Sequence, residues 1–127
     1  MMYLTVDELL AIHLEAIREL GGAAEILDFK KLESSLETPR QTMFGEDLYP
    51  DLVSKAAILF VLVIKNHPFM DGNKRTATLA LLEFLERNGH RLESTNDELY
   101  QFAIDAATSV LDKDQVANWI RARLQAA

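Results

Sequence analysis

The sequence predicts an all-α fold, a compact helical bundle built around one buried central helix. In several stretches, a helix-capping residue is followed by apolar residues at helical spacing. Residues 51–66 are apolar at almost every position, and a run of this length is more typical of a buried helix than of a buried strand. The chain contains no alternating run bounded by tight hairpin turns, so no partner strands are expected.

The composition predicts a single domain over residues 1–127. The chain is 49% hydrophobic, which is enough to bury a core that needs no disulfide or metal ion to stabilise it. It has no cysteine, which excludes disulfides and thiolate metal sites and makes the cytoplasm the expected location. No stretch resembles a secretory signal or is long enough to span a membrane. The net charge of -7 argues against a broad nucleic-acid surface but leaves room for a small cationic pocket.

The first predicted helix begins at a capping box formed by Thr5 and Glu8 and ends at the pair Gly21-Gly22. Its apolar residues form one stripe, and His13 lies on that stripe. A buried histidine with a satisfied hydrogen bond is a more ordinary interpretation of this position than a catalytic role.

A short second helix is predicted to begin after Asp28, to run through Leu36 and to end before Pro39. The following residues, 41–51, have no helical period. They form either a loop or a short hairpin, and the length of the segment suggests that it is mobile or functional.

Three more helices are predicted after the central one. Residues 77–85 have helical spacing, which places Lys74 and Arg75 in the first turn of a helix that ends at Asn88-Gly89. The next helix starts at a capping box and turns these residues inward: Leu99, Phe102, Ala103, Ala106 and Val110. The last starts at Asp112 and carries the core residues Val116, Trp119, Ile120 and Leu124.

The candidate site is the polar stretch between the two apolar segments, residues 67–76 (HPFMDGNKRT). Cations at a helix N-terminus are unfavourable by roughly 0.3 to 1 kcal/mol each unless an anion joins them. The stretch supplies two such cations, Lys74 and Arg75, free backbone N–H groups from Asn73 to Thr76, and a Gly72 that lets a ligand approach the backbone. Together these features predict a phosphate-binding cradle.

The remaining residues of the stretch suggest a reaction. His67 is the one histidine in the stretch, and histidine is the side chain most often used as a general base acting on a hydroxyl. Asp71 is a hard oxygen ligand, and Mg²⁺ commonly bridges one such carboxylate and nucleotide phosphates. Lys74 and Arg75 would neutralise the phosphates, while Asn73 either adds an amide donor or holds the loop in shape.

Two alternatives compete with this interpretation. The ordinary one is a polar loop in which Asn73 caps the helix and the cations are solvated. This alternative gives no reason why His, Asp, Gly, Asn, Lys and Arg should occur together in one short stretch. A Walker loop needs a second glycine where Asn73 stands. Phe69 is expected to anchor the loop in the core.

The pattern His67-x-Phe69-x-Asp71-Gly72-Asn73-Lys74-Arg75 resembles the signature of the Fic/Doc (Fido) family, with the lysine that is found in its Doc (death-on-curing) type. The resemblance continues in Gly21-Gly22 and in residues 28–39 and 84–90. It implies a Fic/Doc-type helical bundle in which His67 is the catalytic base, Asp71 the Mg²⁺ ligand, and Gly72 to Arg75 the phosphate-binding turn. It also implies that residues 41–51 are a short flap against which a target segment docks in extended form.

The family contains two chemistries that differ at one position of the signature. Members with glycine in place of Lys74 transfer AMP, whereas the Doc type transfers the γ-phosphate of ATP. Thr78 also stands where many AMP-transferring members have a second arginine, although Pro68 and Gly72 match the AMP-transferring form. The resemblance therefore implies a Doc-like toxin, a protein kinase that uses Mg²⁺ and ATP, modifies elongation factor Tu and blocks translation; the alternative is an AMP transferase.

A non-catalytic interaction module is a third possibility, and the presence of both His67 and Asp71 argues against it. Many Fic proteins carry an inhibitory helix with Ser or Thr, three residues, Glu, and then Gly or Asn. The closest matches, starting at Thr42 and Ser94, fail at the last position. Inhibition by a separate antitoxin chain is therefore expected, with no direct nucleic-acid or membrane partner.

Overall fold

The computed structural model describes residues 1–127 and confirms the predicted mainly helical class. The helices are α1 (Val6–Leu20), α2 (Phe29–Glu37), α3 (Leu52–Asn66), α4 (Asn73–Arg87), α5 (Asn96–Ala107) and α6 (Lys113–Arg123). A single 3-10 turn, η1 (Thr38–Arg40), follows α2, and four short strands complete the fold: β1 (Thr42–Met43), β2 (Glu46–Asp47), β3 (His90–Leu92) and β4 (Leu124–Ala126).

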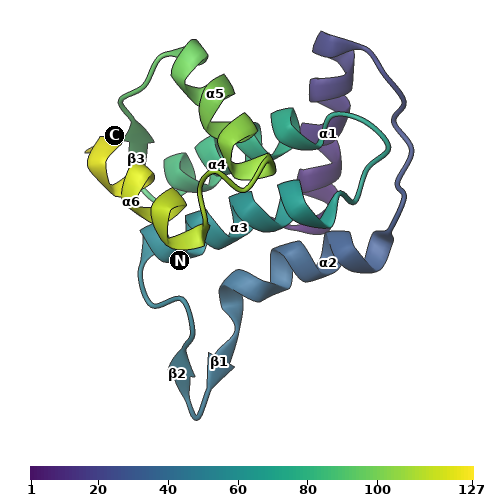
Figure 1. Cartoon of the computed structure of the whole chain (residues 1–127). Coiled ribbons are helices and arrows are strands. Elements are labelled where there is room, and N and C mark those ends of the chain that lie inside the picture. The colour runs from purple at the N-terminus through teal and green to yellow at the C-terminus, as the bar shows by residue number, and fades with distance from the viewer.

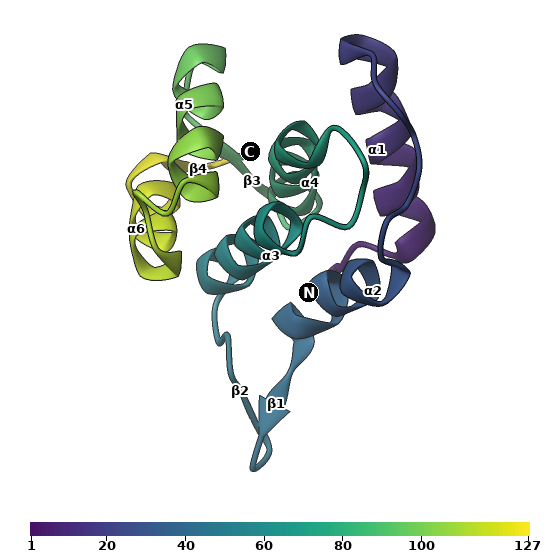
Figure 2. The ribbon, with the colours of Figure 1, turned by 45° about the vertical axis from the view of Figure 1, so that its right-hand side comes forward.

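Helix α3 is the buried central helix that the sequence predicts. Nine of its 15 residues are buried. Figures 1 and 2 show why: α3 and α4 lie between α1 and α2 on one side and α5 and α6 on the other. A helix covered on several sides has no polar face, which explains its continuous apolar sequence. None of the helices combines the length and the apolar character that a membrane span requires.

Side-chain caps define where the helices begin. The caps predicted from the sequence form at Thr5, Asp28, Thr95 and Asp112, and Asp51 caps α3 in the same way. Each such cap typically contributes about 1 kcal/mol, because it satisfies a backbone N–H that has no partner within the helix. Helix α4 is the exception: its N-cap residue is Gly72, which offers no side-chain cap.

The C-terminal part of the chain corrects two predictions. Helix α5 ends at Ala107, so Val110 lies beyond it and is 64% exposed instead of turned inward. Leu124 belongs to β4, not to the last helix, and pairs with Leu92 in an antiparallel two-stranded sheet that was not predicted. Trp119 packs between helices as predicted, with its ring stacked on Phe102 at a centroid distance of 3.8 Å.

An ion pair joins the first turn of α1 to the last turn of α4. The Arg87 guanidinium bonds the carboxylate of Glu8 and, at 2.9 Å, that of Glu83. The Arg87 hydrogen bond, assisted by the backbone N–H of Thr5, lowers the pKa of Glu8 to about 2. A depressed carboxyl pKa adds stability at neutral pH, and this contribution is lost only as the pH falls from about 4.5 toward 2.

Residues 41–51 contain a hairpin, one of the two predicted alternatives. Strands β1 and β2 pair antiparallel, and the two residues that join them, Phe44 and Gly45, both have positive φ, as the common hairpin turn requires. The hairpin projects from the bundle beside the start of α3 (Figure 1).

The hairpin lies in the segment that is expected to be the docking flap. It lies at the N-terminal end of α3, whereas His67 follows the C-terminal end. A 15-residue helix is about 22 Å long, so the length of α3 separates the two. Docking of a target segment against the hairpin stays a prediction, and such a segment would have to extend along α3 to reach His67.

Candidate active site

The predicted site occupies the loop between α3 and α4, and both ends of this loop are left-handed. His67 ends α3 with φ 49° and ψ 56°, and Gly72 begins α4 with φ 80° and ψ 17°. Glycine adopts this conformation freely, but a non-glycine residue there is strained by roughly 1 to 3 kcal/mol. The surrounding contacts must therefore hold His67 in place.

The segment between α1 and α2, residues 23–28, supplies part of this support. The Leu27 N–H donates to the Pro68 carbonyl at 2.8 Å, and the Met70 N–H donates to the Glu25 carbonyl at 2.9 Å. The site loop is thus paired like a strand with a distant part of the chain. This pairing was not predicted, because residues 23–28 show no strand pattern of their own.

Phe69 and Asn73 support the loop from inside. Phe69 is fully buried, which confirms its predicted role as the anchor of the loop. The Asn73 amide accepts a hydrogen bond from the Phe69 N–H at 3.1 Å and donates to the Phe69 carbonyl at 2.8 Å. Of its two predicted roles, the side chain of Asn73 therefore holds the loop in shape, and only its backbone N–H is left for an anion.

Asn73→Ala is expected to lower the free energy of unfolding by about 2 to 3 kcal/mol, because it leaves the buried N–H and carbonyl of Phe69 without partners. Asn96→Ala is the matched control, since Asn96 is the first residue of α5 as Asn73 is of α4, and it is exposed. The control should change stability by less than about 0.5 kcal/mol. Urea unfolding measures both, and equal effects would mean that the Asn73 amide does not hold the loop.

The first turn of α4 presents free donors. The backbone N–H groups of Asn73, Lys74 and Arg75 have no acceptor in the protein. The fourth predicted donor is not free, because the Thr76 N–H bonds the Gly72 carbonyl at 2.9 Å. An uncapped helix N-terminus with an exposed lysine in its first turn favours an anionic ligand.

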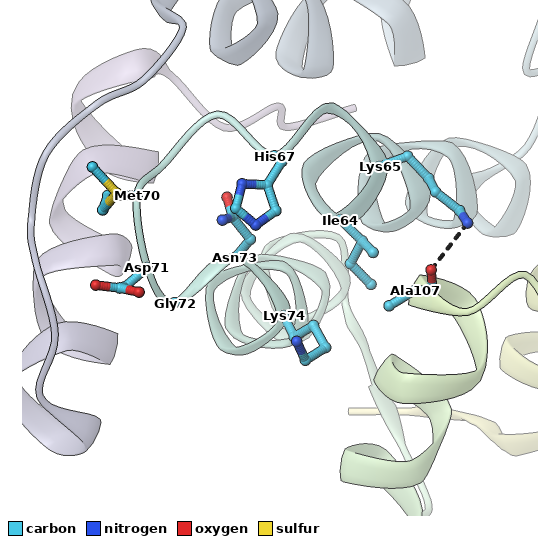
Figure 3. Close-up of a pocket in the computed structure, with 9 residues that line it drawn as sticks. All are labelled: Ile64, Lys65, His67, Met70, Asp71, Gly72, Asn73, Lys74 and Ala107. Atoms are coloured by element: carbon cyan, nitrogen blue, oxygen red, sulfur yellow. Dashed lines mark hydrogen bonds between the residues drawn. The ribbon is translucent and has the colours of Figure 1, made fainter.

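Five of the six predicted site residues line one cavity of about 330 Å³: His67, Asp71, Gly72, Asn73 and Lys74. Figure 3 shows His67 at the centre of this group, with Lys74 at the first turn of α4 and Lys65 directed toward α5. The site is therefore one concave surface, in which a proton acceptor and a cation line the same cavity and Asp71 lies at its α1 side.

Arg75 lies apart from this group. Its guanidinium pairs with Glu19 of α1, with Nη2 and Oε2 3.0 Å apart. It lines a second cavity of about 490 Å³ between the end of α1, α4 and α5. Gly72, Asn73 and Lys74 line both cavities, so the start of α4 forms the wall between them.

Asp71 is directed toward α1 and away from Lys74 (Figure 3). Its Oδ2 accepts a hydrogen bond from the Ala23 N–H at 2.8 Å. Gly22 permits this approach, because a Cβ built there would lie 3.0 Å from the Asp71 Cβ and its φ of +107° disfavours any other residue. The sequence analysis identified Gly22 only as part of a helix end and of the family resemblance, and it missed Ala23 and the contact of both residues with Asp71. The second glycine was the available signal, since one glycine is enough to end a helix.

Lys65 is the other residue that sequence reasoning missed. It stands two residues before His67, lines the first cavity, and its ammonium donates to the Ala107 carbonyl at 3.2 Å. The only feature of the sequence that could have indicated its place at the site is its proximity to His67. Because it tethers α3 to the end of α5, it helps to shape the cavity.

The residues at the site can be compared with the ligands that Mg²⁺ requires. No group of three or more His, Asp or Glu side chains is arranged to hold a metal ion. Asp71 is the one carboxylate that lines the first cavity. Mg²⁺ usually retains several waters and binds through one or two carboxylates plus substrate phosphates, so this site fits a magnesium ion that arrives with a nucleotide and not one held by the protein alone.

Comparison with known proteins agrees with the resemblance seen in the motif. The model of the Fic/DOC family matches residues 3–85. The chain is 36% identical over 99 residues to "Toxin Doc" of Mycolicibacterium smegmatis, which covers 76% of each protein. It is 31% identical over 121 residues to "Protein kinase doc" of Escherichia phage P1, which covers 95% of this chain and 94% of the phage protein.

Proposed function

Because the chain belongs to the Fic/Doc family, we propose that it is a toxin of the Doc type, a protein kinase that transfers the γ-phosphate of ATP to a hydroxyl of a target protein. The observation that carries this proposal is the position of Lys74. It stands at the uncapped start of α4 and shares a cavity with His67. A cation at this point is suited to bind the group that is transferred.

The reaction is a single displacement at the γ-phosphorus. The target hydroxyl gives its proton to His67, its oxygen bonds to the γ-phosphorus, and the bond from that phosphorus to the bridging oxygen of the β-phosphate breaks, so that ADP leaves. Lys74 and the free N–H groups at residues 73–75 stabilise the charge on the phosphate oxygens. His67 is exposed at the end of α3, where a hydroxyl of another protein can reach it.

Asp71 would hold Mg²⁺, which neutralises phosphate charge when it is bound. One of its oxygens bonds the Ala23 N–H, and the other has no protein partner. This leaves an oxygen for the metal and fixes the carboxylate at the same time.

Asp71→Asn should therefore reduce the magnesium dependence of ATP binding. The amide oxygen can still accept from Ala23, so the loop is retained while the charge that holds the metal is lost. Calorimetric titration with ATP at several Mg²⁺ concentrations measures the effect, with Asp114→Asn on the exposed face of α6 as the control. An unchanged response of affinity to Mg²⁺ would place the metal ligand elsewhere.

The proposed target is elongation factor Tu, whose phosphorylation would block translation, and the proposed regulator is a separate antitoxin chain. Both follow from the similarity to Doc-type proteins, one of which is named a toxin. The lack of an inhibitory helix pattern in the sequence supports a regulator in a separate chain.

Transfer of AMP is the second candidate reaction. Pro68 and Gly72 favour it, because both match the AMP-transferring form of the motif. It would use the same base and the same cradle, but the α-phosphorus of ATP would face the target hydroxyl and pyrophosphate would leave.

One experiment separates the two reactions. The purified protein is incubated with Mg²⁺, a bacterial lysate or purified elongation factor Tu, and ATP labelled at either the α- or the γ-phosphate. The kinase proposal expects label on the target from γ-labelled ATP alone. Label from α-labelled ATP would establish the AMP transferase, and label from neither would contradict both.

A further inference from the structure

His13, to which the reaction above assigns no step, lies directly beneath the site loop. Its side chain is 1% exposed. Its ring is stacked on the ring of Phe69, with the centroids 3.7 Å apart and the planes within 6° of parallel. Phe69 stands midway between His67 and Asp71 in the chain, so His13 touches the centre of the loop from the side that faces the core.

The polar contact of His13 is with the backbone of Asp71. Its Nε2 lies 2.8 Å from the Asp71 carbonyl oxygen. A carbonyl oxygen only accepts hydrogen bonds, so Nε2 must carry a hydrogen and donate it. This carbonyl has no other donor in the protein.

The other backbone contacts of the loop come from elsewhere. The Pro68 carbonyl is held by residues 27–28, the polar groups of Phe69 by Asn73, and the Gly72 carbonyl by Thr76. The orientation of the peptide between residues 71 and 72 is thus the part of the loop that depends on His13.

That peptide determines how α4 begins. It leads into Gly72, whose left-handed conformation starts the helix. Gly72 also lies close against α1, because a Cβ built there would come within 3.2 Å of Ile17 Cδ1 and 3.8 Å of His13 Nε2. If the peptide turned, Gly72 would move, and the free N–H groups at residues 73–75 would point in another direction.

We propose that His13 is a positioning residue of the active site, which orients the 71–72 peptide and thereby the phosphate-binding start of α4. This inference rests on the proposed function, in which ATP phosphates bind there. His13 is buried and acts through Asp71 and Gly72, without contact with ATP or target.

The pair His13→Gln and His13→Met tests this role. The two side chains have nearly the same shape and both lack the aromatic stacking, but only glutamine ends in an N–H donor. The glutamine variant should bind Mg²⁺-ATP within about threefold of the wild-type affinity, and the methionine variant about tenfold more weakly, since a buried hydrogen bond of this kind is worth about that factor. Calorimetric titration without target, at a temperature where circular dichroism indicates folded protein, measures both.

A second measurement needs no nucleotide. The amide N–H of Gly72 belongs to the peptide that His13 orients, so its resonance in a ¹⁵N-labelled sample should move in the methionine variant and return toward its wild-type position in the glutamine variant. If the methionine variant does not fold, His13→Phe keeps the stacking on Phe69 without the donor and replaces it in both measurements.

Equal ATP affinities and an unmoved Gly72 resonance in the folded variants would overturn the role of His13. A wild-type protein that does not bind ATP would instead contradict the proposed function. In that case the Gly72 resonance still decides whether His13 orients the loop.

Discussion

His67→Ala is expected to lower the rate of phosphoryl transfer by about 10² to 10⁴, the usual contribution of a general base. ATP binding and the fold should persist, because the imidazole is exposed and only the backbone of His67 is needed to end α3. Initial rates with γ-labelled ATP, together with a titration of ATP binding, measure the two quantities separately.

Two further variants make this result specific. His90→Ala removes a histidine of β3 that lies outside both cavities, and it should leave the rate unchanged. His67→Asn removes the base but keeps a residue type that tolerates the left-handed conformation, so an equal loss in this variant excludes backbone strain as the cause. Full activity in His67→Ala would mean that another group accepts the proton.

Lys74→Gly is expected to lower phosphoryl transfer roughly a hundredfold, because a preorganised charge at such a site stabilises the transition state by ~3 kcal/mol. The substitution also clears the space that the lysine occupies beside the free N–H groups of α4. Since Pro68 and Gly72 already match the AMP-transferring form, we expect α-labelled ATP to label the target in this variant. Rates with both labels, on the same target, measure the change.

Two controls separate the effect of the lost charge from the effect of the space that the substitution opens. Lys74→Ala removes the same charge but opens less room, so it should lose γ-transfer without an equal gain of α-transfer. Lys30→Gly makes the same substitution at the second residue of α2, the position that Lys74 has in α4, and should leave both rates unchanged. If the wild-type protein already transfers the α-label, Lys74 does not set the orientation of ATP.

The sequence predicted those parts of the fold that depend on neighbouring residues. A capping box is formed by side chains three positions apart, so Thr5 with Glu8 and Thr95 with Glu98 could be identified from spacing alone. The buried central helix could be identified because residues 51–66 offer no polar face. The same locality explains the site: five of its six predicted residues lie within eight positions and therefore line one cavity.

Contacts between distant residues could not be predicted in this way. Nothing near His90 indicates that it pairs with Ala126, because neither strand has a pattern long enough to be recognised. Val110 was assigned to the core from helical spacing, and its exposure follows from the end of α5 at Ala107, which spacing does not determine.

By itself the sequence determined the helices and the composition of the site loop, since both arise from short-range spacing. Only the tertiary structure decided how the loop is held and where its groups point: Asp71 toward Ala23, Arg75 toward Glu19, and His13 beneath the loop. It also placed the hairpin at the far end of α3 from His67. These orientations depend on the packing of α1 and the segment after it against the loop, and contacts between residues so far apart in the chain leave no periodic trace in the sequence.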